Sequence, residues 1–126
     1  MKRLSKTFIF CCFSLLTVNA VSHHSTNANF TQEIISVDGV IQQVSFQNPH
    51  ASVLIKNTDS AGVETFWLLE SGARSTLERK GISFDILEIG TPVTATGRKG
   101  RRQYTMYLQE LIFEDGSKFV PEPAVR

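Results

Sequence analysis

The sequence predicts a small all-β domain with one short helix, arranged as an OB-fold-like barrel of five to six strands. Three observations support this prediction: apolar and polar residues alternate with a period of two, turn-forming residues separate these stretches, and one short helical pattern follows the third stretch. Three strands, a helix and two strands is the chain order of the OB-fold, a five-stranded Greek-key barrel. A β-sandwich is the alternative, and an α/β sheet is disfavoured because crossover helices are missing.

The N-terminal segment of the 126-residue chain has the features of a secretory signal peptide. Basic residues precede an apolar run at 7–18, which is too short to cross a bilayer because a spanning helix takes about 20 residues. We therefore expect export to a bacterial periplasm and no membrane span after cleavage. Cleavage after Ala20 and cleavage after Ser22 both remain open. The predicted segments are the signal at 1–20, a flexible histidine-containing arm at 21–32, the barrel domain at 33–120 and a C-terminal tail at 121–126.

Cysteine usage and charge exclude several classes of function. Cys11 and Cys12 are the only cysteines and lie inside the signal, so the mature chain has no disulfide and no Cys-ligated metal. Three of the 13 basic residues lie in the signal, and all 12 acidic residues lie after it. The mature chain therefore has a net charge of about −2. A slightly acidic chain argues against nucleic-acid binding, which depends on a positive surface.

The first strand changes the face on which its apolar residues lie. Ile35 to Ile41 alternate on one face, whereas Val44 and Phe46 fall on the other. Such a change of phase predicts a bulge or a sharp bend, beginning near Gly39. The expected strands cover 33–46, 50–56, 63–70, 92–98, 103–113 and 118–120.

The helix is expected at 73–80, with Ser71 as its N-cap and Gly81 just beyond its C-terminus. Residues 83–89 are expected to form a second helical turn that closes at Gly90. The basic residues at 99–102 are expected at the tip of the hairpin between the fourth and fifth strands.

Several short motifs, taken together, resemble one known family. They are His23-His24-Ser25, Gly39-x-Ile41, Val44-x-Phe46-x-Asn48-Pro49-His50-Ala51, Trp67-x-x-Glu70, Leu77-x-x-x-Gly81, Gly90-x-x-Val93-x-x-x-Gly97 and Asp115-Gly116. With these motifs the mature chain resembles domain-of-unknown-function family 6152, a family of small exported bacterial proteins. The chain departs from the family pattern at Phe46, where Trp is commoner, and at Val21-Ser22, which separate Ala20 from His23. The resemblance implies a periplasmic β-barrel and no established activity.

The sequence predicts no catalytic residues. The mature chain has no Cys nucleophile, no Gly-x-Ser-x-Gly, no phosphate-cradling loop and no His-Glu-x-x-His motif. Glu70 is interpreted as a capping or ion-pairing group beside Ser71 and Arg74 rather than as a catalytic acid.

Three histidines, His23, His24 and His50, form the candidate metal site, with copper as the candidate cofactor. After cleavage at Ala20, the free amine, two amide nitrogens and the His23 ring suit a square-planar Cu(II) or Ni(II) site. After cleavage at Ser22, the amine and ring of His23 could chelate copper, with His50 as a third ligand. The alternative is a polar arm with two solvated histidines, in which His50 is a turn residue.

A second candidate site binds a small anionic ligand or a protein without metal. It combines the Asn48–His50 corner with Arg98, Arg101 and Arg102, because loops between strands 1–2 and 4–5 flank the ligand face of OB-folds. Outward-pointing aromatic residues would add stacking groups. The alternative places Trp67 in the core and makes the basic tip a solvated turn that protects a hairpin edge. The sequence therefore predicts an exported, non-enzymatic binding protein with either of two sites.

Overall fold

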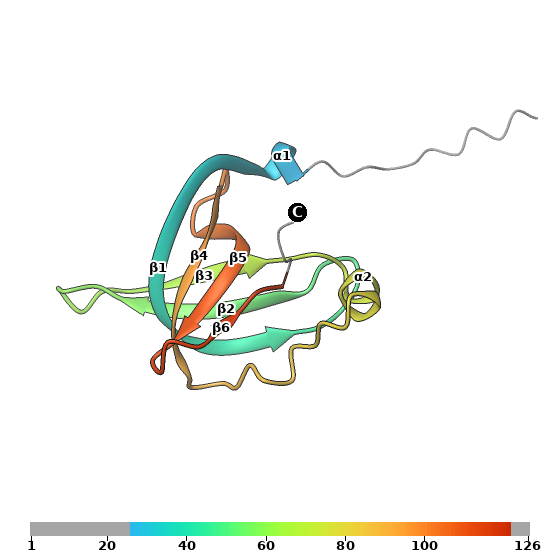
Figure 1. Cartoon of the computed structure of the whole chain (residues 1–126). Coiled ribbons are helices and arrows are strands. Elements are labelled where there is room, and N and C mark those ends of the chain that lie inside the picture. Colours follow the sequence, from blue (N-terminus) through green and yellow to red (C-terminus); the bar gives the residue numbers. More distant parts are fainter. Residues whose placement is uncertain (1–25, 122–126) are drawn as a thin grey trace, which may run out of the picture.

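The longest element of the structure is a curved strand, β1 (Phe30–Ser45), against which the rest of the chain is built (Figure 1). The computed structural model describes residues 26–121. The other elements are α1 (Thr26–Asn29), β2 (Ser52–Thr58), β3 (Glu64–Glu70), α2 (Arg74–Arg79), β4 (Pro92–Gly100), β5 (Thr105–Phe113) and β6 (Lys118–Phe119). No helix within the described range is long and apolar enough to cross a membrane.

The six strands form one sheet in the order β3-β2-β1-β4-β5-β6. Neighbours in this order are antiparallel, and a short parallel pairing of β3 with β5 joins the sheet into a ring of five strands. In the ring, Leu68 lies beside Thr105 and Glu70 beside Tyr107. The predicted all-β fold with a helix between β3 and β4 is confirmed, and the ring favours the barrel over the sandwich.

The change of phase in β1 comes from a β-bulge. Ile41 lies opposite Ile55 and Gln43 opposite Leu54, so Gln42 is an extra residue without a partner on β2. The bulge was expected near Gly39, and the structure places it three residues later. Gly39 has a different role: a Cβ there would lie 2.9 Å from the carbonyl oxygen of Lys56, so the residue lets β2 approach closely.

The hydrophobic core lies inside the ring and is formed mainly by the side chains of the strands that point inward. Leu77 of α2 and two residues of the following loop, Phe84 and Leu87, are also buried in it. Trp67 is partly buried and packs against the core, as the core interpretation of this residue predicts. The fully buried strand residues are Ile41, Val53, Ile55, Leu69, Ala95, Met106, Leu108 and Leu111.

Helix α2 is shorter than predicted and is not capped by Ser71. Its N-cap is Ala73, which provides no side-chain hydrogen bond. The hydroxyl of buried Ser71 instead points back to the carbonyl oxygen of Ala51 at 3.5 Å. Gly81 adopts φ +73° directly after the C-cap Lys80, which confirms the predicted helix end.

The second helical turn predicted at 83–89 is wrong, because this segment is a loop with isolated turns. The backbone N–H of Leu87 bonds the carbonyl of Phe84 at 2.9 Å, which is a turn rather than a helical repeat. Phe84 and Leu87 are three positions apart, so in a helix their side chains would lie on the same face. The single turn that they form here also buries both side chains in the core, without a helix.

The predicted flexible arm at 21–32 differs from the structure in its described part. Residues 26–29 form α1, and β1 begins at Phe30 rather than at residue 33. The predicted signal peptide, both predicted cleavage sites, His23 and His24 lie outside the described residues, as does most of the predicted tail.

Candidate functional site

The β4–β5 hairpin carries four basic residues, Arg98, Lys99, Arg101 and Arg102, which we call the basic tip. The hairpin lies beside α1, so the start of the described chain meets residues about 70 positions later in the sequence (Figure 1). The four residues differ in their surroundings: Arg98 is half-buried, Lys99 is exposed and lies 3.7 Å from Glu33, and Arg101 and Arg102 line a pocket.

Arg98 is half-buried and uses its guanidinium to hold α1 and the start of β1. Its Nη2 donates to Asn27 Oδ1 at 2.7 Å and to the Phe30 carbonyl at 3.3 Å, and its Nε donates to the Thr31 carbonyl at 2.8 Å. Its Nη1 reaches Thr26 Oγ1 at 3.1 Å. These bonds join two side chains of α1 and the first two carbonyls of β1 to β4. The geometry therefore gives Arg98 a structural role.

Arg101 and Arg102 are exposed at the rim of a pocket of about 470 Å³ between α1, the end of β3 and the β4–β5 loop. The backbone N–H of Arg101 bonds the carbonyl of Asn29 at 2.9 Å, which fixes the loop against α1. Arg102 faces Glu70 at 4.0 Å with 73% of its side chain exposed, a pair that contributes little. Glu70 thus has an ion-pairing role, as predicted, although its partner is Arg102 and not Arg74.

The Asn48–His50 corner lies at the N-terminus of α2. Asn48 Oδ1 accepts the backbone N–H of Ser75 at 3.1 Å, and the Gln47 carbonyl accepts the N–H of Arg74 at 3.2 Å. Asn48 therefore satisfies a free donor of the helix in the way that an N-cap side chain does. The sequence did not indicate this role, because the cap lies 27 positions before the helix residue that it binds.

Replacing Asn48 with alanine is expected to destabilise the domain by about 1 kcal/mol, the usual cost of losing an N-cap acceptor. Asn48→Asp retains an oxygen acceptor and should recover most of this loss. Urea unfolding of the three proteins would measure the difference. Equal stability of Asn48→Ala and the parent chain would show that the bond to Ser75 contributes nothing.

His50 is exposed on this corner. Within residues 26–121, no group of three or more His, Cys, Asp or Glu side chains is arranged to hold a metal ion. His23 and His24 lie outside that range, so the structure does not show whether they approach His50. In the described part of the chain, no hydrogen bond or ion pair links the corner with the basic tip.

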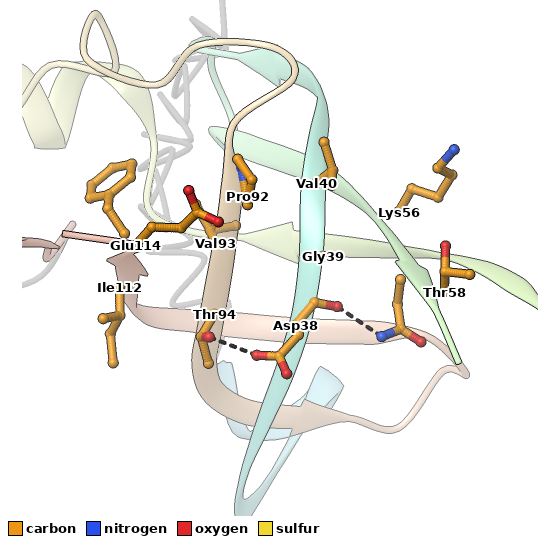
Figure 2. A pocket seen from close by; sticks show the side chains of 12 residues that line it. Asp38, Gly39, Val40, Lys56, Thr58, Pro92, Val93, Thr94, Ile112 and Glu114 are labelled. Atoms are coloured by element: carbon orange, nitrogen blue, oxygen red, sulfur yellow. Dashed lines mark hydrogen bonds between the residues drawn. The ribbon is translucent and has the colours of Figure 1, made fainter. Parts of the chain in front are cut away.

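A third surface, which the sequence analysis missed, runs across the outside of β2, β1, β4 and β5 (Figure 2). Asp38 is at its centre: Asp38 Oδ1 accepts the Thr94 hydroxyl at 2.6 Å, and its carbonyl accepts Asn57 Nδ2 at 2.8 Å. Lys56 and Thr58 lie on the β2 side of the hollow, and Glu114 lies on the β5 side. No motif marks this surface, because its residues come from four separate strands and the turn after β5.

The described part of the chain thus contains a pocket lined by Arg101 and Arg102, the Asn48–His50 corner that caps α2, and an outer hollow. A family model described as "Family of unknown function (DUF6152)" matches residues 12–108. No curated protein and no solved structure was found to match the chain.

Proposed function

Because the chain belongs to DUF6152, a family of unknown function, we propose from its own geometry that it is an exported, non-enzymatic module that binds a small anionic ligand at the basic tip. The observation that carries the proposal is the pair of exposed guanidinium groups, Arg101 and Arg102, on one rim of the pocket beside α1. This is the part of the predicted metal-independent site that the geometry favours.

Guanidinium groups suit carboxylate, phosphate and sulfate groups because their planar donors can bind two oxygens at once. Among the described residues, Arg101 has no side-chain partner, and Arg102 has only the 4.0 Å contact with Glu70. Both positions are set by the backbone bond from Arg101 to Asn29 and by the way Arg98 holds α1. A ligand would therefore meet two available charges on a fixed loop.

The test compares binding of inorganic phosphate and of a sulfated disaccharide by NMR titration. Arg101→Ala/Arg102→Ala is expected to weaken binding of at least one probe by about tenfold or more, since a hydrogen bond to a charged group contributes roughly 1.5–3 kcal/mol. The matched control is Arg74→Ala/Arg79→Ala, which removes the same charge from α2. Equal weakening by the control, or no effect of the first variant, would contradict the proposal.

A second proposal is that His23 and His24 bind a copper ion, with His50 as a further ligand of the metal. It is supported by the exposure of His50 on a corner that is anchored to α2 through Asn48. The experiment measures the intact mass of periplasmic protein with and without one equivalent of Cu(II), which also identifies the first residue of the exported chain. Copper retention equal to that of a His23→Ala/His24→Ala variant would reject this proposal and leave the anionic ligand unaffected.

A further inference from the structure

Two hollows adjoin on the side of the barrel that carries the 82–91 loop and the β5–β6 turn. The hollow of Figure 2 and a second hollow of about 460 Å³ share Pro92, Phe113 and Glu114 as lining residues. The second hollow adds residues from the loop before β4 and from the β5–β6 turn, chiefly Ile86, Glu88 and Asp115. We call the two together the acidic trough.

The second hollow has an apolar wall that is exposed to solvent. Ile86 is 62% exposed and lines the hollow with Pro92 and Phe113, and Ile89 of the same loop is 71% exposed. The loop is anchored because two of its side chains are buried in the core: Phe84, which precedes Ile86, and Leu87, which follows it. Exposed aliphatic side chains on an anchored loop beside a hollow are typical of an interaction site.

Among residues 26–121, no carboxylate of the trough forms an ion pair. The ion pairs of the described residues use Glu33, Glu64, Glu70, Glu78 and Glu110, all of which lie outside the trough. Its carboxylates are Asp38, Glu88, Glu114 and Asp115. The one lysine in its lining, Lys56, is paired with Glu64 at 2.9 Å, and its ammonium group points away from the hollow in Figure 2.

Asp115 remains a carboxylate to low pH. The hydroxyl of Ser117 and then its backbone N–H donate to Asp115 Oδ1, at 2.6 and 2.8 Å, and these bonds lower the pKa of the Asp115 carboxyl. A negative charge therefore persists at this end of the trough throughout the neutral range.

We propose that the acidic trough docks a protein segment that carries a lysine or arginine next to a large apolar side chain. The apolar side chain would pack on Ile86, Pro92 and Phe113, and the cation would lie among the carboxylates of the rim. A cationic segment without an apolar side chain would leave the apolar wall exposed to solvent. An acidic segment would bring like charges together, so neither fits both parts of the surface.

This inference does not depend on the ligand of the basic tip, because the two surfaces share no residue. Ion pairs at an exposed rim contribute little and are screened by salt, so the apolar contact has to provide much of the affinity. We therefore expect weak binding that falls as salt is added and that needs both kinds of side chain.

The test uses the purified protein, isotopically labelled, and a six-residue synthetic peptide that alternates lysine with leucine. NMR shift changes are expected at residues 86–92 and 113–117, with lysine–serine and glutamate–leucine peptides binding at least about tenfold more weakly. Shift changes concentrated elsewhere would overturn the proposal, as would equal binding of the lysine–serine peptide.

Two variants separate the trough from the overall charge of the protein. Glu88→Lys/Glu114→Lys is expected to weaken binding of the lysine–leucine peptide about fivefold, the effect of losing roughly 1 kcal/mol of exposed ion pairing, whereas Glu33→Lys/Glu78→Lys makes the same change of charge elsewhere and should have a smaller effect. Ile86→Ser tests the apolar wall and should also weaken binding. Equal loss in both charge variants would reject the trough as the site, as would normal binding by Ile86→Ser.

Discussion

Replacing Gly97 with alanine is expected to destabilise the barrel by about 3 kcal/mol or more, at the upper end of the usual cost of overpacking. A Cβ at this position would overlap the carbonyl oxygen of Tyr107 and would lie 2.9 Å from Met106 Cγ. Gly97 lies where the register between β4 and β5 shifts, so two backbones meet closely there. The Tyr107 carbonyl cannot move without opening the pairing of the two strands.

Denaturant unfolding would measure this loss as a lower midpoint with little change of slope. The matched control is Gly62→Ala, because a Cβ on Gly62 meets open space and the substitution costs only its left-handed conformation, at φ +81°. That cost is about 1–2 kcal/mol. If Gly97→Ala were no more destabilising than Gly62→Ala, the close approach of β4 and β5 at Gly97 would not be the cause.

Replacing Leu69 with alanine is expected to cost about 2–5 kcal/mol, through lost apolar burial and the cavity that remains. Leu69 is fully buried, and it lies between Val53 on β2 and Met106 on β5. It therefore contributes to the core at the parallel pairing that joins the sheet into a ring. Thermal and urea unfolding should agree on the size of the loss.

Leu68→Ala is the matched control, because it removes the same atoms from the neighbouring residue on the opposite face of β3. Leu68 is only half-buried, and its backbone N–H would still bond the Tyr104 carbonyl. We expect a loss of about 1 kcal/mol, the average for a point mutation. Equal losses for the two leucines would show that the inner face of β3 contributes no more to stability than its outer face.

The strands and their order could be predicted because the signals for them are local. Alternating residues such as Val53 and Ile55 reveal a strand within a few positions, and the clusters at 57–62 and 114–116 mark the turns between strands. The predictions that failed concern features set by distant partners. Helix α1 depends on Arg98, about 70 positions away.

The same limit applies to the candidate sites. The basic tip is contiguous in sequence, so its position on a hairpin could be predicted, but the structural role of Arg98 could not. The acidic trough combines residues from four regions of the chain, such as Asp38 and Glu114, and only the barrel brings them together. Sequence alone also gave Asn48 no role as a helix cap, because that role depends on where α2 begins.

The central place of β1 in the sheet has a consequence for how the chain folds. One edge of β1 pairs with β2, which follows it closely in the sequence. The other edge pairs with β4, which comes much later in the chain: the hydrogen bond between Ser36 and Thr96 joins residues 60 positions apart. Contacts over such separations require long loops to close first, which makes folding slow. We expect the first three strands to assemble as a meander with the outer edge of β1 bare, and β4 and β5 to complete the ring last. Until then the bare edge of β1 can pair with another chain, so this interval is when the protein is most prone to aggregate.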